Sequence, residues 1–208
     1  MSGRPRALVL LALAWLAGLA LSFAVAVDRA TWLMETAPAM VALPLLWATA
    51  PRFRFTALAY ALIAAHGLVL MLGGAYTYAR VPAGFWLQDA LGLARNPYDR
   101  IGHLAQGFVP AILARELLIR IFAVDPRALV ALLAAAIALA ISAGYELLEW
   151  GAAVALGAGA DAFLGTQGDP WDTQADMFCA LVGALAALAL LGRVHDRAIA
   201  RLAGAMTG

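Results

Sequence analysis

Six long apolar runs restrict the fold of this chain more than any other feature. They cover Ala7–Val27, Thr31–Ala50, Thr56–Tyr76, Ile101–Ile119, Ala128–Trp150 and Asp176–Gly192. A transmembrane helix needs about 20 mostly apolar residues. Inside a bilayer the backbone polar groups must bond within their own segment, which favours helices. We therefore predict an all-α fold, a polytopic bundle of six transmembrane helices.

The composition supports a membrane protein and excludes other classes. The chain has 208 residues, of which 64% are hydrophobic and 13% are charged, whereas about a quarter are charged in a typical soluble domain. The net charge is only +1 and there is no long basic run, which argues against a nucleic-acid partner. The single cysteine excludes an intramolecular disulfide and a cysteine-based metal site. No internal repeat or linker is present, so residues 1–208 are predicted to form one integral membrane domain.

The arginines predict the orientation of the bundle. Nine arginines fall on one side of the six-span arrangement, namely Arg4, Arg6, Arg52, Arg54, Arg120, Arg127, Arg193, Arg197 and Arg201. Four fall on the other side, namely Arg29, Arg80, Arg95 and Arg100. Because basic residues concentrate in cytoplasmic loops, we expect both termini in the cytoplasm and the two long connections on the outer face.

Acidic residues and one histidine gather at the ends of three predicted helices. Asp99 and His103 open the fourth span, Glu146 and Glu149 lie near the end of the fifth, and Asp169, Asp172 and Asp176 open the sixth. Asp89 and Asp161 occupy the two long connections on the same side. Ionisable residues in spans are costly and therefore candidates for function. These groups are expected to meet at the outer membrane face.

Crowded carboxylates need arginine partners, shared protons or a bound cation. Arg95 and Arg100 are close in sequence, and carboxylates with an imidazole also suit a divalent metal ion. The candidate metal ligands are Asp99, His103, Glu146, Glu149, Asp172 and Asp176. The candidate catalytic residues are Glu146, Glu149 and His103. A divalent metal ion is therefore the candidate cofactor.

Helix capping is the alternative interpretation for part of this group. The sequence from Asp169 to Asp172 has an acid, a proline and a second acid, which is typical of a helix start. Asp99 follows Asn96 and Pro97 and suits a cap as well. Glu146 and Glu149 lie at a helix C-terminal end, where the dipole disfavours anions. They are therefore the strongest functional candidates.

The remaining polar residues within or beside the spans have simpler predicted roles. His66 lies mid-span and is expected to bond to a neighbouring helix. Glu116 is expected to pair with an arginine, and His195 to be a solvated surface residue. Four tryptophans, Trp32, Trp86, Trp150 and Trp171, are expected in the aromatic belt at the outer interface.

Four sequence stretches resemble a known family. They are Gly84–Asp89 (GFWLQD), Asn96–His103 (NPYDRIGH), Tyr145–Trp150 (YELLEW) and Gly165–Met177 (GTQGDPWDTQADM). With them the chain resembles the YjdF-type family of bacterial inner-membrane proteins along nearly its whole length. The resemblance implies a multi-pass protein of the inner membrane, and it implies no particular reaction.

A fainter similarity connects the chain to VanZ-like membrane proteins. Asp99–His103 is similar to their Asp-Lys-x-x-His opening, and Glu146–Glu149 to their Glu-x-x-Gln with Glu in place of Gln. Asp172 or Asp176 corresponds to their final Asp, although the Asn that follows it there has no convincing match. The shared feature is the order Asp/His, then Glu, then Asp.

Three functions remain open from the sequence. The first is metal-assisted chemistry on, or binding of, a lipid-linked substrate at the outer face of the inner membrane. The second is a small ion- or proton-coupled transporter that uses the same acids as a relay. The third is a non-catalytic structural membrane module. Membrane lipids are expected partners under all three.

Overall fold

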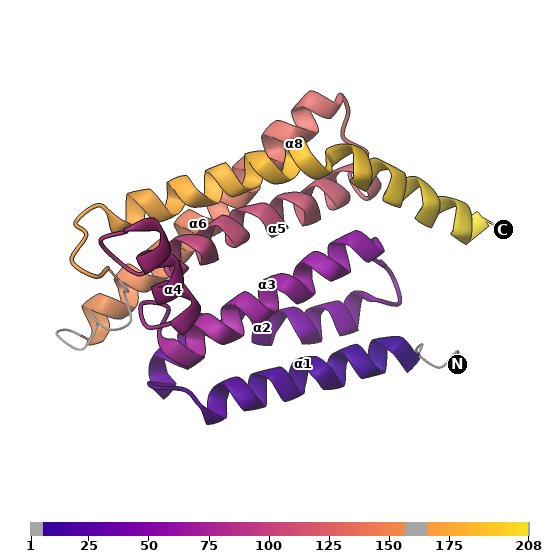
Figure 1. The fold of residues 1–208 in the computed structure, drawn as a ribbon. Coiled ribbons are helices and arrows are strands. Elements are labelled where there is room, and N and C mark those ends of the chain that lie inside the picture. Colours follow the sequence, from indigo (N-terminus) through magenta and orange to yellow (C-terminus); the bar gives the residue numbers. More distant parts are fainter. Residues whose placement is uncertain (1–5, 157–165, 208) are drawn as a thin grey trace. The chain divides into compact units, whose positions relative to one another are not determined.

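The computed structural model describes residues 6–156 and 166–207, which form seven helices and no strand (Figure 1). The helices are α1 (Arg6–Ala24), α2 (Arg29–Thr49), α3 (Ala57–Tyr76), α4 (Pro82–Leu91), α5 (Tyr98–Arg120), α6 (Arg127–Leu156) and α8 (Asp172–Thr207). The predicted all-helical fold is therefore confirmed. Each of the six predicted spans coincides with one long helix, and α4 is an additional short helix in the first long connection.

Three helices are long and apolar enough to cross a membrane by themselves. They cover Ala57–Tyr76 in α3, Arg127–Ala155 in α6 and Asp172–Gly204 in α8, and Val9–Ala24 forms a shorter apolar helix. In α5 the charged residues lie near both ends, which lowers its apolarity. The count of six spans and the cytoplasmic position of the termini stay predictions.

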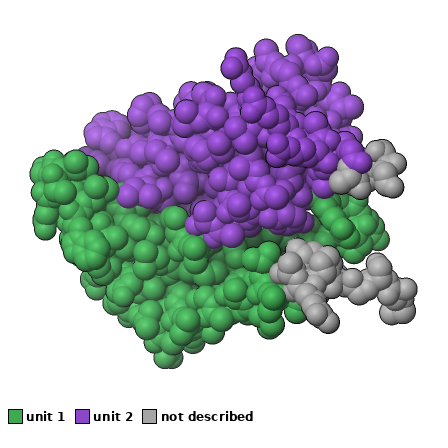
Figure 2. Space-filling view, turned by 45° about the vertical axis from the view of Figure 1, so that its right-hand side comes forward, with its two compact units in different colours: residues 1–54, 67–98 green, residues 55–66, 99–208 purple. Residues whose placement is uncertain are grey.

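The helices divide into two compact units, shown in separate colours in Figure 2. Unit 1 contains residues 1–54 and 67–98, and unit 2 contains residues 55–66 and 99–208. Helix α3 contributes its first half to unit 2 and its second half to unit 1. The single-domain boundary stays a prediction.

Tryptophan and serine side chains connect the helices of unit 1. Trp32 Nε1 donates to Ser22 Oγ at 2.8 Å, and Ser22 Oγ donates to the Met71 carbonyl at 2.5 Å. Trp32 is 6% exposed, so its indole packs within the protein, and its place in the aromatic belt stays a prediction. At the start of α2, Asp28 accepts a hydrogen bond from the Thr31 backbone N–H at 2.7 Å, which lowers the pKa of the Asp28 carboxyl.

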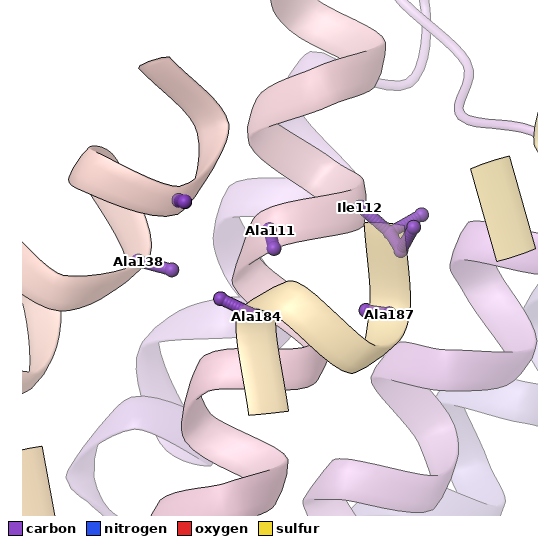
Figure 3. Close-up of a cluster of buried hydrophobic side chains, with 6 residues drawn as sticks. Ala111, Ile112, Ala138, Ala184 and Ala187 are labelled. Carbon is purple, nitrogen blue, oxygen red and sulfur yellow. The ribbon is translucent and has the colours of Figure 1, made fainter. Parts of the chain in front are cut away.

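Small side chains bring α5, α6 and α8 together in unit 2. Figure 3 shows Ala111 of α5, Ala138 of α6 and Ala184 of α8 pointing toward one another. All three are fully buried, and Leu62 of α3 packs against the same cluster. Lipid tails are as apolar as these side chains, so membrane helices gain most from close packing of small residues.

Two glycines bring α5 and α8 closest together. A Cβ added at Gly107 would overlap the backbone carbonyl of Ala180. A Cβ at Gly183 would overlap the carbonyl of Leu104 in the same way. The contact between Gly107 and Ala180 lies one helical turn from His103 on α5 and Asp176 on α8, so it fixes the helix separation beside the predicted site.

Candidate metal centre

The helices of unit 2 bring most of the predicted site residues into one buried group. We call this group the acidic cluster; it comprises Asp99, Arg100 and His103 of α5, Glu146 of α6, and Asp169, Asp172 and Asp176 at the start of α8. Asp99, His103, Glu146, Asp172 and Asp176 are each less than a tenth exposed. The helical spacing predicted from the sequence therefore does place these side chains on facing surfaces.

Arg100 is the arginine partner of the acids on α8. Its Nη2 lies 3.0 Å from Asp169 Oδ2 and 2.8 Å from Asp172 Oδ1, and its Nη1 forms an ion pair with Asp176. Nη1 also donates to the Asp172 backbone carbonyl at 3.0 Å. One guanidinium thus connects α5 to the first turn of α8 at several points.

Asp169 has both roles that the sequence left open. Its Oδ1 accepts a hydrogen bond from the Trp171 backbone N–H at 2.9 Å, as expected of a residue at a helix start. Its Oδ2 pairs with Arg100. Helix capping and charge pairing therefore coexist at this residue.

His103 lies between acids on both edges of its ring. Nε2 is 3.6 Å from Asp99 Oδ1 and 3.7 Å from Asp176 Oδ1. On the opposite edge, Nδ1 is 3.8 Å from Glu146 Oε1. These separations exceed hydrogen-bond distances of about 2.7–3.2 Å, so the groups are adjacent without being bonded to each other.

Besides Asp176 Oδ1, which is ion-paired with Arg100, two buried atoms of this arrangement have no hydrogen-bond partner among the described residues. They are His103 Nδ1 and Glu146 Oε1. The side chains are 8% and 6% exposed. Leaving such a group unsatisfied costs about 1–3 kcal/mol. Folding has thus positioned two polar atoms side by side without bonding either of them to the protein.

Three residues have side-chain donor atoms that lie as close to one another as the ligands of a metal ion. Within the described part of the chain, Asp99, His103 and Asp176 each offer one ligand atom within 4.8 Å of the others. Glu149, another predicted ligand, is half-buried and lies close to one turn beyond Glu146 on α6. Asp161 lies outside the described residues.

A second polar group lies near the other end of α5, and only its pairing of Glu116 with an arginine was predicted from the sequence. We call it the Glu116 cluster; it comprises Thr56, Arg115, Glu116, Arg120, His195 and Asp196. Glu116 Oε1 accepts from the Thr56 N–H at 2.8 Å and from Arg120 Nη1 at 2.5 Å. Oε2 accepts from Thr56 Oγ1 at 2.8 Å and lies 2.9 Å from His195 Nε2. The predicted pairing of Glu116 with an arginine is confirmed.

His195 is fully buried, so its prediction as a solvated residue is wrong. It follows Ala184, Ala187 and Leu191 at helical spacing on the face of α8 that packs into the core. That spacing continues past Gly192, where the predicted span ended. Extending the apolar stripe by one turn would have identified His195 as buried.

The Glu116 cluster also fixes the tautomer of His195. Arg115 Nη1 lies 3.1 Å from His195 Nδ1, and a guanidinium has only donors. Nδ1 must therefore accept, and Nε2 must carry the proton that it donates to Glu116. Arg115 Nη2 in turn donates to Asp196 Oδ1 at 2.7 Å. Each end of the imidazole ring is thus matched by a complementary group.

Comparison with known proteins places the chain in a family. The family model described as "Predicted membrane protein (DUF2238)" matches residues 7–197. The chain belongs to the DUF2238 family. It is also 57% identical over 181 residues to the inner membrane protein YjdF of Escherichia coli K12, covering 87% of this chain and 86% of that protein. No solved structure matches the chain.

Membership of the DUF2238 family confirms two expectations from the sequence. The resemblance to YjdF-type proteins is correct, and the chain is a protein of the bacterial inner membrane. The fainter similarity to VanZ-like proteins stays a prediction.

Proposed function

We propose that the chain binds one divalent cation through Asp99, His103 and Asp176, and that this ion assists hydrolysis or group transfer on a lipid-linked substrate. The observation that carries the proposal is the position of His103. Its Nε2 faces Asp99 and Asp176, while its Nδ1 faces Glu146, and both Nδ1 and Glu146 Oε1 lack a protein partner within the described residues.

The distances between His103 Nε2 and the two aspartates suit ligands of one ion. Two ligands that each lie about 2.2 Å from Zn²⁺ are at most about 4.4 Å apart, and about 5.2 Å is the corresponding limit for Ca²⁺. The distances from His103 Nε2 to Asp99 and Asp176 are 3.6 and 3.7 Å. Small side-chain rotations are therefore enough to coordinate an ion, and the mixed nitrogen and oxygen donors favour Zn²⁺ or Mn²⁺ over Ca²⁺.

The charges favour a cation at the same place. Within the described residues, one arginine and one histidine are surrounded by Asp99, Glu146 and the three aspartates at the start of α8 and just before it. Like charges held this close push protons onto carboxylates unless a cation neutralises them. A divalent ion supplies two positive charges, and it neutralises the carboxylates without additional hydrogen-bond donors.

Glu146 is proposed to orient His103 rather than to bind the ion. The two nitrogens of one imidazole point in different directions. Glu146, which faces Nδ1, therefore cannot also reach an ion that is bound to Nε2. Histidine ligands commonly donate their second N–H to a carboxylate, which fixes the tautomer and raises ligand basicity. Glu146 Oε1, 3.8 Å from Nδ1, is in the position for that role.

Three protein ligands leave an open coordination position, which a catalytic ion needs for water or substrate. Trp150 lies one helical turn beyond Glu146 and Trp171 directly precedes Asp172, and the two are 67% and 68% exposed. Tryptophans of this kind are enriched where membranes meet water. An ion at this level would meet the headgroup region of a lipid or lipid-linked substrate.

A structural role is the second candidate, and Arg100 is the observation in its favour. Its guanidinium already pairs with Asp169, Asp172 and Asp176, so it supplies part of the positive charge that the acids require. Under this alternative the cluster fastens α5 to α8 and binds no ion.

Metal binding by the purified full-length protein separates the two candidates. The protein is dialysed in detergent against Zn²⁺, Mn²⁺, Ca²⁺ or Mg²⁺ in turn, and bound metal is measured by mass spectrometry. We expect about one ion per chain and its loss in Asp176→Asn. Asp196→Asn is the matched control, because Asp196 is on the same helix and pairs with Arg115 in the other cluster. No stoichiometric ion in the unmodified protein, or equal binding by Asp176→Asn, would overturn the proposal.

A further inference from the structure

The acidic cluster is followed, one helical turn deeper in unit 2, by a second layer with polar groups. Helix geometry defines this layer, because residues three or four apart lie on the same face. Leu62, Ala111, Ala138 and Ala184 belong to one apolar core cluster. One turn from these residues toward the acidic cluster lie His66 on α3, Gly107 on α5, Ser142 on α6 and Ala180 on α8. His103, Glu146 and Asp176 follow one turn further.

Two polar atoms in this layer have no hydrogen-bond partner within the described residues. They are His66 Nε2 and Ser142 Oγ, and both atoms are buried. Ser142 is completely inaccessible to solvent. His66 Nε2 therefore does not make the hydrogen bond to a neighbouring helix that was predicted for His66, within the described part of the chain.

These atoms continue the unbonded atoms of the acidic cluster. Ser142 lies four residues before Glu146 on the buried face of α6, and His66 lies four residues after Leu62 of the apolar core cluster. The residues that carry His66 Nε2 and Ser142 Oγ thus lie one helical turn from the layer that carries His103 Nδ1 and Glu146 Oε1, and all four atoms lack a hydrogen-bond partner within the described residues. The other two members of the deeper layer, Gly107 and Ala180, close the layer on the α5–α8 side, because their backbones are in direct contact.

We infer that this layer is a hydrated chamber, in which water connects His66 and Ser142 to His103 and Glu146. Buried water typically makes about three hydrogen bonds to groups that the protein leaves unsatisfied. A ring nitrogen, a hydroxyl and a carboxylate oxygen supply both donors and acceptors for such water. The chamber brings water to the middle of the predicted membrane span, and it gives protons a path between His66 and the acidic cluster. It needs no metal ion, so it is independent of the proposed function.

Radiolytic footprinting of the full chain in lipid nanodiscs tests this inference. Hydroxyl radicals made from bound water modify the side chains that contact it, and mass spectrometry resolves the three histidines of the chain. We expect His66 to be modified severalfold faster than His195. His195 is the internal control, because it is fully buried and both of its ring nitrogens face protein groups. Equal and slow modification of His66 and His195 would overturn the inference.

A pair of substitutions tests the part played by Ser142. Ser142→Val removes the hydroxyl and fills space, so modification of His66 should fall by severalfold. Ser142→Ala removes the hydroxyl but leaves the space, so modification should stay near that of the unmodified protein. If Ser142→Val leaves His66 as reactive as before, the chamber does not include Ser142. The comparison of His66 with His195 needs neither variant to fold.

Discussion

The acidic cluster and the Glu116 cluster use similar residues but differ in how completely these residues are bonded. Each combines a buried glutamate with a histidine, arginine and aspartate of the α5–α8 pair, and in the acidic cluster the glutamate comes from α6. In the Glu116 cluster both carboxylate oxygens and both ring nitrogens face complementary protein groups. In the acidic cluster, Glu146 Oε1 and His103 Nδ1 face each other at 3.8 Å without a hydrogen bond.

This difference separates two uses of buried charge in one helical unit. A completely bonded network fixes helices relative to one another, and removing a member leaves buried groups without partners. An incompletely bonded group costs stability, which is typical of sites that bind a ligand or carry out chemistry. We therefore attribute stability to the Glu116 cluster, and the proposed ligand binding belongs to the acidic cluster.

The largest expected effect comes from Glu116→Gln. The amide places an NH₂ group where Thr56, Arg120 and His195 all present donors, so the buried network loses one of its two acceptor oxygens and the negative charge. Breaking a buried ion pair by removing one partner costs about 3–5 kcal/mol. The free energy of unfolding from an SDS titration in mixed micelles should fall by that amount. Unchanged stability would remove the distinction between the two clusters.

His195→Leu should have the next largest effect. It leaves Arg115 Nη1 and Glu116 Oε2 each without one partner, at about 1–3 kcal/mol for an unsatisfied buried group. His195→Gln should lose less, because its amide can still donate to Glu116. Equal losses in the two variants would contradict the assigned Nε2–H tautomer. The same titration in mixed micelles measures both variants.

Gly107→Ala tests the close approach of α5 and α8 beside the acidic cluster. The added methyl group would overlap the Ala180 carbonyl, and overpacking of this kind costs about 1–3 kcal/mol. Gly192→Ala is the matched control, because a Cβ there meets no atom within 4 Å. Thermal unfolding in detergent should show a lower midpoint for Gly107→Ala alone. A similar midpoint in both variants would mean that the two helices are free to separate.

The smallest effect on stability is expected for Glu146→Gln. This substitution removes a charge that is crowded by Asp172 and Asp176, and it breaks no hydrogen bond to Oε1. Stability without metal should stay within about 1 kcal/mol of the unmodified protein, or rise. Affinity for the ion should still fall by about 10–100-fold, as for other partners of ligating histidines. A loss as large as in Glu116→Gln would show that both clusters are structural.

The sequence predicted the helices well because their signal is local. Each of the six apolar runs corresponds to a helix, and Pro110 lies inside α5 without ending it. The short helix α4 was missed because it lies in a connection, where no long apolar run marks it. Its boundaries depend on Pro82 at the start and on Gly92, which has a left-handed conformation, at the end.

The residues of the candidate site were also predicted, but the way in which they face one another was not. Helical spacing identified Asp99, His103, Glu146 and Asp176 as neighbours. Spacing along one helix cannot show which edge of the His103 ring faces which acid, since that depends on how α6 and α8 pack around α5. Arg100 was predicted only as a nearby charge. Its three aspartate partners at and just before the start of α8 could be identified only from the fold.

Nitrogen-15 NMR of the histidine side chains during a Zn²⁺ titration tests the central claim most directly. The three histidines represent the acidic cluster, the deeper layer and the Glu116 cluster. We predict that one equivalent of Zn²⁺ shifts Nε2 of His103, while His195 retains its Nε2–H tautomer throughout. A spectrum in which His103 does not respond, or in which His195 responds first, would contradict the assignment of ligand binding to the acidic cluster.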